Sequence, residues 1–422
     1  MRTDDVRGNE ERVVSFDEAL EIVLRQASWA RKPRVERIRL EEASGRVLAV
    51  PITADRDQPP FNRSTRDGFA VRVADAGAGT WLAVAGQIRA GTGWEGLAAP
   101  DEALEIMTGA PVPDGADAVV MVEHVERSGA AEKQAIRLAE GRSISAGENI
   151  VCRGSEARAG DEVLTEGTVM NPAAVALAAS CGANSMEVFA RPTVSILATG
   201  DELVDVGDTP GPYQIRNSNS YGLAALVAEA GGTPLRQPVA PDRRQELEDL
   251  ILRAQTADLL LLSGGVSMGE YDLVEEVLRE LGAEFFFTGV RMQPGKPVVF
   301  GRVPEREGMR GVYFFGLPGN PVSTQVTFAC FVEPLLRAMR GATAVGPRFV
   351  QATLGEDVPG KVGLMRVLPA KLTWERMKPE VRLVVWQGSG DMAANARANC
   401  YAILPPDVAR FSSGDVITVL LR

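Results

Sequence analysis

The stretch that most constrains the fold is residues 259–272, LLLLSGGVSMGEYD, in which a continuous apolar run ends in a glycine turn. An apolar run that stops at Ser263, Gly264 and Gly265 is typical of a buried strand in a parallel sheet. The amphipathic residues 273–281 that follow predict a helix. Because ligands bind beyond the carboxyl ends of the strands in open α/β sheets, we expect this turn to be a ligand loop.

A second turn of the same kind lies downstream, where the apolar residues 312–317 precede Pro318, Gly319, Asn320 and Pro321. Asparagine is a favoured helix N-cap, and proline suits the first helical position because no amide hydrogen is needed there. Free amides at a helix N-terminus, with the positive end of the helix dipole behind them, bind anions. Two glycine turns in one domain therefore indicate a phosphorylated ligand.

The size and charge of the chain limit its class. At 422 residues it is too long for one ordinary core, so we expect two to four domains. The net charge of -11 and the absence of a basic stripe argue against nucleic acid as a partner. The sequence has neither an apolar leader nor a membrane-length apolar run, and we expect a cytoplasmic protein without membrane contact.

Cysteine and histidine are too sparse for a transition-metal site. The four cysteines, Cys152, Cys181, Cys330 and Cys400, are widely spaced, and His124 is the single histidine. Any metal must therefore be held by oxygen atoms or by a ligand that brings its own donors.

The order of apolar patterns predicts a multidomain α/β plus β protein. Strands alternate with helices over residues 188–340, which predicts a central, mostly parallel α/β domain. Helical segments flank a stretch of short strands, so a β-rich module is inserted into a helical N-terminal domain, and short strands with glycine and proline turns predict a small C-terminal β barrel. The expected boundaries are 13–55 and 153–187 for the helical domain, 56–152 for the module, 188–340 for the α/β domain and 341–422 for the barrel.

Acidic side chains recur at predicted strand ends and helix starts: Asp67, Asp201, Glu202, Asp242, Glu270 and Asp272. Each alone is typical of helix or turn capping; Asp242, for example, suits the cap of a helix over residues 243–255. Together, beside two phosphate turns, they favour a Mg²⁺ site. Lys296, between Pro294 and Pro297, supplies a rigidly held cation for an oxyanion.

Two further residues have simpler alternatives. Asp67 with Gly68 reads equally well as a tight turn. Thr108, at a strand end before a proline turn, is typical of a hydroxyl that caps its own turn.

Six motifs in register resemble one family over nearly the whole chain. They are Pro59-Pro60-Phe61 with Ser64 and Asp67-Gly68-Phe69-Ala70, Met107 to Pro113, Thr199-Gly200-Asp201-Glu202-Leu203, Ser263 to Ser267, Pro294-Gly295-Lys296-Pro297 and Gly316 to Ser323. Together they resemble the molybdopterin molybdenumtransferases, the MoeA and gephyrin E-domain family.

The resemblance implies insertion of molybdate into adenylylated molybdopterin, with release of AMP and a requirement for Mg²⁺. It implies functional roles for Asp67, Thr108, Glu202 and Asp272, and metal ligation by Asp242, Asp272 and Glu202. The implied binding residues are Gly264, Gly265, Ser267, Pro318, Gly319 and Asn320 for the pterin nucleotide, and Pro294, Lys296, Pro297, Arg366 and Ser389 for molybdate. It also implies a homodimer and contact with the molybdopterin adenylyltransferase.

Two alternatives stay open: an adenylyltransferase that activates the pterin with ATP, and a pterin-binding scaffold without catalysis.

One loop departs from the family. Arg63 and Arg66 stand where the family carries neutral residues, and Glu156 stands where it often carries aspartate. Guanidinium groups directed at Asp67 would lower the pKa of its carboxyl group, whereas groups facing solvent would leave it alone.

Overall fold

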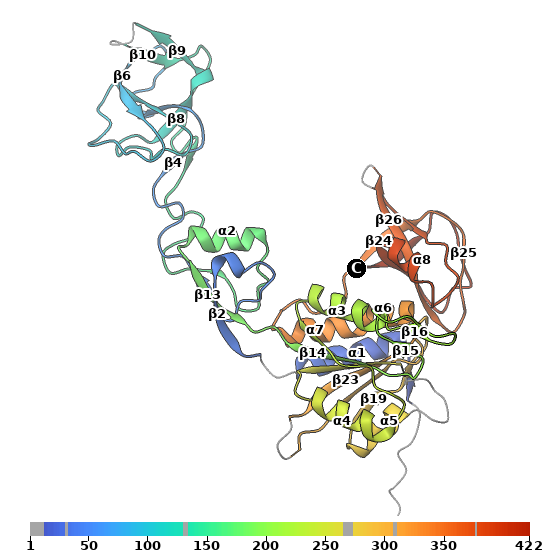
Figure 1. The fold of residues 1–422 in the computed structure, drawn as a ribbon. Helices are drawn as coiled ribbons and strands as arrows, with labels where there is room; N and C mark the ends of the chain where they lie inside the picture. Colours follow the sequence, from blue (N-terminus) through green and yellow to red (C-terminus); the bar gives the residue numbers. More distant parts are fainter. Residues whose placement is uncertain (1–11, 30–32, 130–133, 265–272, 307–309, 376–377) are drawn as a thin grey trace, which may run out of the picture.

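The structure, a computed structural model, describes residues 12–29, 33–129, 134–264, 273–306, 310–375 and 378–422. They form an α/β domain, an arm unit (residues 35–55 and 153–189), a β module inserted into the arm unit, and a C-terminal barrel (Figure 1). The multidomain α/β plus β class is confirmed. The predicted site residues Gly265, Ser267 and Asp272, and also Glu270, lie outside the described residues.

The α/β domain is built on a six-stranded sheet in which the buried apolar strands pair in parallel, as expected. The strand order is β17, β14, β18, β23, β22, β19; the first four run parallel, β22 is antiparallel to β23, and β19 is antiparallel to β22. Their bounds are Thr233–Arg236 for β17, Thr193–Ala198 for β14, Leu259–Ser263 for β18, Val312–Leu317 for β23, Val299–Val303 for β22 and Glu284–Phe287 for β19.

Helices cover both faces of this sheet (Figure 1). One face packs against α3, α6, the short π-helical η3 and α7, and the other against α4 and α5. The bounds are Asn219–Glu229 for α3, Pro321–Thr327 for α6, Phe328–Val332 for η3, Glu333–Met339 for α7, Arg244–Ala254 for α4 and Leu273–Glu280 for α5. Two covered faces explain why the central strands are apolar without alternation.

Helix α1, Phe16–Ser28, corrects the expected domain assignment. Ser15 caps it, because its hydroxyl accepts a hydrogen bond from the Glu18 amide at 3.2 Å. Its buried stripe packs on the α/β domain, with Phe16 against Phe331 at 5.5 Å between ring centroids, and not on the arm unit. Each large side chain buried this way stabilises the contact by roughly 1.5 to 3 kcal/mol.

The arm unit contains one helix and short strands, fewer helices than its sequence pattern suggested. Helix α2, Pro172–Ser180, begins at the predicted cap Asn171, whose side chain accepts from the Ala174 amide at 2.9 Å. Antiparallel pairs join β2 to β13 and β3 to β12. The bounds are Val35–Arg39 for β2, Leu40–Glu42 for the 3-10 turn η1, Ile52–Thr53 for β3, Glu162–Leu164 for β12 and Ser185–Phe189 for β13.

The inserted module is a six-stranded sheet in the order β8, β5, β7, β6, β10, β9, as its glycine-punctuated strands predicted. The bounds are Gly68–Val71 for β5, Leu82–Ile88 for β6, Glu102–Ile106 for β7, Ala118–Met121 for β8, Val125–Ser128 for β9 and Ala135–Leu138 for β10. A two-residue pair, β4 (Arg63–Ser64) with β11 (Ile150–Val151), joins it to the arm unit. Figure 1 shows the module at the far end of the arm unit from the α/β domain.

The C-terminal domain closes into the predicted small barrel. Strands β26, β27, β24, β30 and β28 follow one another, and β28 pairs again with β26. The bounds are Phe349–Leu354 for β24, Met365–Glu375 for β26, Lys378–Leu383 for β27, Cys400–Leu404 for β28 and Val416–Leu421 for β30, with helix α8 at Met392–Arg397. Strand β21 of the α/β domain, Met292–Gln293, pairs with β26 and fastens the two domains together.

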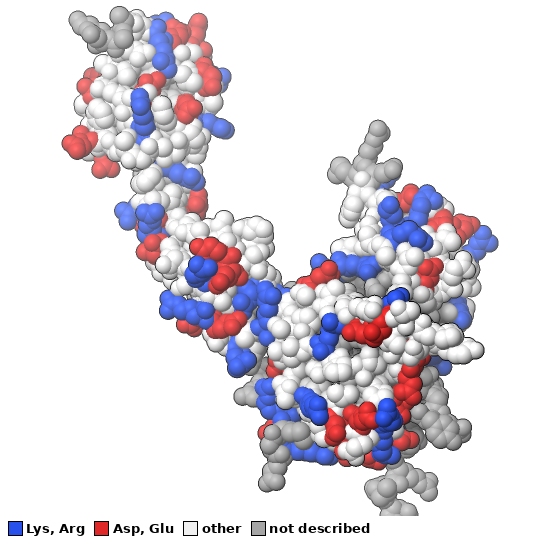
Figure 2. All heavy atoms as spheres, viewed as in Figure 1, with Lys and Arg blue, Asp and Glu red and all other residues white. Residues whose placement is uncertain are grey.

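The surface in view mixes both charges. Figure 2 shows acidic and basic side chains interspersed, with basic ones gathered where the arm unit meets the α/β domain. Across the part of the chain that the structure describes, no helix has the length and apolar character to cross a membrane.

Candidate functional site

A cavity of about 810 Å³ lies at the carboxyl ends of β14, β18 and β23, where the sequence predicted a ligand crevice. The sheet register aligns Ala198, Ser263 and Leu317, so the turns that follow these strands begin side by side. The predicted site residues on the cavity wall are Glu202, Gly264, Pro297, Pro318, Gly319 and Asn320. Thr199, Asn219, Gly390 and Met392 also line it, and sequence reasoning did not single them out as site residues.

Glycine is required at position 264, in the turn that follows β18. Gly264 has φ +90°, and a Cβ atom there would lie 2.5 Å from the carbonyl oxygen of Thr199. Gly319 is less restricted, because a Cβ atom there would meet only the Gly264 Cα, at 3.8 Å. The turns after β14, β18 and β23 are thus packed backbone to backbone, which leaves backbone groups to face a ligand.

The helix start after β23 is confirmed, with one change to its expected chemistry. Asn320 is the N-cap of α6 and Pro321 is its first residue. The amide of Val322, the next residue, donates to the Ser389 carbonyl oxygen at 3.0 Å. This amide is therefore not free for an anion; instead it holds a loop of the barrel against the cavity.

Three carboxylates gather at the same edge, all on exposed residues. The Asp242 amide donates to Asp201 Oδ1 at 3.2 Å, and the Glu202 carboxylate folds against Gly200. Asp242 does not cap the following helix, whose N-cap is Arg243. Among the described residues no three carboxylate, histidine or cysteine side chains form a ready metal cluster, and Asp272 lies outside them.

Asp67 and Thr108 meet each other in the β module. The carboxylate Oδ1 of Asp67 accepts from the Thr108 amide at 2.6 Å and from the Thr108 hydroxyl at 2.8 Å. These two hydrogen bonds lower the pKa of Asp67 below its ordinary value. The hydroxyl therefore serves Asp67, in place of the turn cap that the sequence allowed. Asp67 directly precedes β5 and Thr108 follows β7, so the pair lies in the module, which Figure 1 shows at the far end of the arm unit from the α/β domain.

The arginines near Asp67 are not what lowers its pKa. Arg63 donates to Glu156 at 2.9 Å, and no arginine contributes to the shift of Asp67. The Arg63 Nε atom is buried and has no hydrogen-bond partner within the described chain. Arg63 thus fastens its loop to the arm unit through Glu156.

The expected molybdate residues come from both sides of the junction between β21 and β26. The register pairs Gln293 with Arg366, so this arginine lies beside the loop that holds Pro294, Lys296 and Pro297. Arg366 donates to the Pro359 carbonyl oxygen at 2.6 Å, its Nε atom is buried without a hydrogen-bond partner among the described residues, and burial lowers the pKa of the guanidinium group. Pro294 is buried, whereas Lys296 is exposed.

Lys361 is a further cation at this junction that sequence reasoning missed. Its Nζ atom donates to Gln293 Oε1 at 3.2 Å. Its only sequence signal was a lysine between turn formers. We infer that a basic corner forms where the barrel meets the α/β domain.

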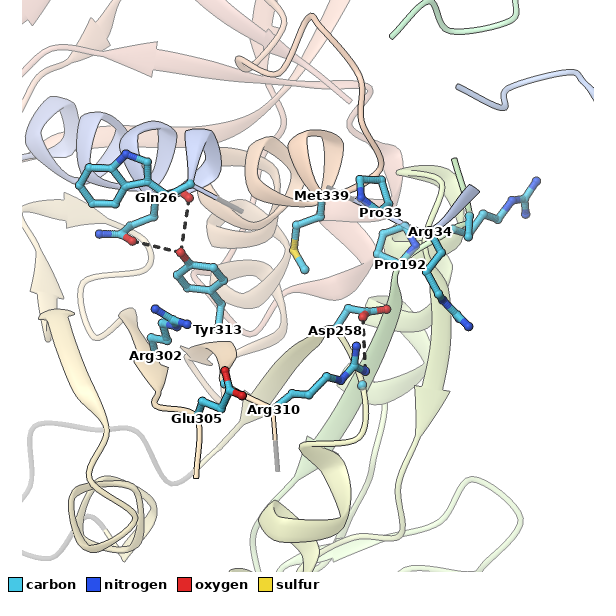
Figure 3. A pocket seen from close by; sticks show the side chains of 15 residues that line it. Gln26, Pro33, Arg34, Pro192, Asp258, Arg302, Glu305, Arg310, Tyr313 and Met339 are labelled. Carbon is cyan, nitrogen blue, oxygen red and sulfur yellow. Dashed lines mark hydrogen bonds and ion pairs between the residues drawn. The ribbon is translucent and has the colours of Figure 1, made fainter. Parts of the chain in front are cut away.

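A second cavity, of about 360 Å³, lies at the opposite, amino-terminal edge of the sheet (Figure 3). Two pairs of its polar groups contact each other: the Tyr313 hydroxyl lies 3.2 Å from Gln26 Oε1, and Arg310 pairs with Asp258 at 3.7 Å. It is smaller than the first cavity and contains none of the predicted site residues. We therefore place the functional site at the carboxyl edge.

Comparison with protein families covers most of the chain in three consecutive regions. Residues 14–182 match the MoeA N-terminal region (domain I and II), and residues 195–338 match a family described as a probable molybdopterin binding domain. Residues 351–421 match the MoeA C-terminal region (domain IV).

Individual relatives match over nearly their whole length. A molybdopterin molybdenumtransferase of Staphylococcus aureus strain COL is 34% identical over 397 residues, which is 91% of this chain and 90% of the relative. That of strain MRSA252 is 34% identical over 421 residues, with coverage of 97% and 95%. The crystal structure of a molybdopterin biosynthesis MoeA protein from Pyrococcus horikoshii OT3 superposes with a TM-score of 0.80 at 29% identity, covering 97% of this chain and all of that one.

Proposed function

Because the chain belongs to the molybdopterin molybdenumtransferase (MoeA) family, we propose that its carboxyl-edge cavity converts adenylylated molybdopterin and molybdate into molybdenum cofactor, with release of AMP. Family membership establishes a transferase of molybdenum cofactor biosynthesis that acts by molybdenum insertion. The substrate form and the AMP product are our proposal. The observation that carries it is a cavity lined by the two glycine turns and by Glu202, with Pro297 from the loop that also holds Lys296.

The adenylate and pyrophosphate fit the glycine turns. The cavity of about 810 Å³ is within the range of small-molecule sites. Close backbone packing at Gly264 and Gly319 allows a charged pyrophosphate to approach main-chain groups. In this arrangement the turns bind and orient the phosphoanhydride whose cleavage leaves AMP.

Molybdate fits the basic corner beside this cavity. Lys296, Arg366 and Lys361 bring cations to the junction of β21 and β26, and Ser389 adds a hydroxyl from the barrel loop that packs on α6. A tetrahedral dianion suits such donors, and Arg366 Nε, which has no partner in the described part of the chain, could donate a hydrogen bond to it. The dithiolene of the pterin supplies the sulfur ligands, so no protein thiolate is needed.

The carboxylates fit Mg²⁺ that is shared with the substrate. Mg²⁺ takes one or two carboxylates together with phosphate oxygens and water. Glu202 and Asp242 would hold it, with Asp272 from the following turn. When bound, it would offset the negative charge of the pyrophosphate as AMP leaves.

To contact a substrate bound in the cavity, Asp67 and Thr108 would have to come from a second copy of the chain. They lie in the module, and Figure 1 shows the module far from the α/β domain, whose strand ends carry the cavity. We propose a homodimer in which the module of one protomer completes the cleft of the other. Contact with the molybdopterin adenylyltransferase and a cytoplasmic location stay predictions from the sequence.

The two alternatives predict different reactions. An adenylyltransferase would consume ATP and pterin, and a scaffold would bind adenylylated molybdopterin without releasing AMP. The curated relatives named as molybdenumtransferases favour insertion over both. Incubation with ATP and unmodified molybdopterin tests the first alternative: formation of adenylylated product would contradict the proposal.

A further inference from the structure

Asn219 joins the two glycine turns of the site. Its side-chain Nδ2 atom lies 3.0 Å from Ser263 Oγ and 2.8 Å from the carbonyl oxygen of Gly319. A carbonyl oxygen only accepts hydrogen bonds, so the atom facing it must be the amide nitrogen and the orientation of the side chain is fixed.

The two partners belong to different turns. Ser263 is 2% exposed and ends β18 directly before Gly264, and Gly319 lies between β23 and α6. They are 44 and 100 residues from Asn219 in the sequence. Asn219 is the first residue of α3, so its side chain ties a helix to both turns at once and sets their spacing.

The chemistry of the amide separates this role from direct phosphate binding. An asparagine side chain has two N–H donors, and here each has a protein acceptor. None remains to donate to a phosphate oxygen. Asn219 therefore acts through its contacts with the two turns, the Ser263 hydroxyl and the Gly319 carbonyl oxygen.

We infer that Asn219 is a positioning residue for the adenylate and pyrophosphate of adenylylated molybdopterin. This inference rests on the proposed function. In this role the Asn219 side chain holds Gly264 and Gly319 at the spacing that lets both turns contact one phosphoanhydride.

The test compares Asn219→Ala with a matched control, Gln237→Ala. Gln237 also donates from a side-chain amide to a serine hydroxyl on the same sheet, Ser195 at 2.9 Å, but it does not line the cavity. We expect Asn219→Ala to raise the KM for adenylylated molybdopterin roughly 5- to 30-fold, as the loss of two ordinary hydrogen bonds implies. The kcat and the melting temperature should follow those of Gln237→Ala.

A second variant, Asn219→Asp, keeps the positioning role testable if Asn219→Ala does not fold. Asn219→Asp keeps the size of the side chain, and aspartate is favoured at a helix start, yet its carboxylate cannot donate to the Gly319 carbonyl. We expect its KM to rise at least as much. In addition, Ser263→Ala should weaken binding in the wild-type background and have a smaller effect in Asn219→Ala, because the hydrogen bond they share is already lost.

The outcomes separate the two claims. Absence of AMP release by the wild-type protein would refute the proposed function. Normal wild-type turnover, with an unchanged KM in both Asn219 variants, would refute only the positioning role. A fall in kcat and melting temperature without a change in KM would also overturn it, because that result marks a merely structural side chain.

Discussion

Thr108 donates two hydrogen bonds to one carboxylate oxygen of Asp67, from its amide at 2.6 Å and from its hydroxyl at 2.8 Å. The two residues are 41 positions apart and lie on facing loops of the module. Both bonds favour the charged carboxylate, so the pKa of Asp67 is lowered. Asp67 is therefore an anion and a hydrogen-bond acceptor at neutral pH, presented at an exposed edge.

Removing the Thr108 hydroxyl should move the pH dependence of the enzyme. In Thr108→Val the pKa of Asp67 rises toward its ordinary value, because one of its two stabilising hydrogen bonds is gone. If the Asp67 carboxylate takes part in turnover, the acidic limb of the pH-rate profile moves to higher pH. Thr108→Ser keeps the hydroxyl and should retain the wild-type limb. Identical limbs for wild type and Thr108→Val would show that the hydroxyl does not tune Asp67.

Arg63 should be dispensable for this tuning. It pairs with Glu156, and both side chains are substantially exposed, at 42% and 55%, so the ion pair contributes less than about 1 kcal/mol. We expect Arg63→Asn to leave the acidic limb of the pH-rate profile in place, and the urea unfolding midpoint close to that of wild type. A limb shifted to higher pH in this variant would mean that Arg63 acts on Asp67 directly.

The two glycines of the cavity should differ in tolerance. Gly264→Ala places a Cβ atom 2.5 Å from the Thr199 carbonyl oxygen at a φ of +90°, which costs more than about 1 kcal/mol in backbone strain alone. Gly319→Ala meets its nearest atom at 3.8 Å, an ordinary contact. For Gly264→Ala the urea unfolding midpoint should fall and the KM for adenylylated molybdopterin should rise. For Gly319→Ala both should change little. Equal behaviour of the two variants would contradict the packing described for these turns.

The carboxylates at the sheet edge should set the requirement for Mg²⁺. Neutralising Glu202 or Asp242, as Glu202→Gln or Asp242→Asn, removes an oxygen donor of full charge. We expect each to raise the Mg²⁺ concentration for half-maximal AMP release several-fold, on the order of the 10-fold change that one lost charged interaction produces. Asp249→Asn, an exposed carboxylate of α4 outside the cavity, is the control. An unchanged Mg²⁺ dependence in both site variants would exclude them as ligands.

Local patterns in the sequence predicted the elements that carry the site. The apolar runs that end at Ser263 and Leu317 form the parallel strands β18 and β23, and Asn320 is the N-cap residue of α6 as expected, although its side chain makes no capping hydrogen bond. Strands of one parallel sheet end at one edge, so the meeting of the turns followed from the pattern as well.

Contacts between segments that are distant in the sequence could not be predicted from such local patterns. The amphipathic spacing of α1 showed that one face is buried, but not that the face packs on the α/β domain. Asn219 was not among the predicted site residues, because nothing in the local sequence indicates hydrogen bonds to residues 44 and 100 positions away. Asp242 had the chemistry of a cap, yet the helix begins one residue later and its amide serves Asp201.

The most direct test of the central claim is AMP release from adenylylated molybdopterin by the purified protein with Mg²⁺, measured with and without molybdate. The product is then used to activate an apo-molybdoenzyme. The proposed function predicts AMP release that depends on molybdate, together with activation of the apo-enzyme. Binding of adenylylated molybdopterin without AMP release at any molybdate concentration would contradict it and would favour a scaffold.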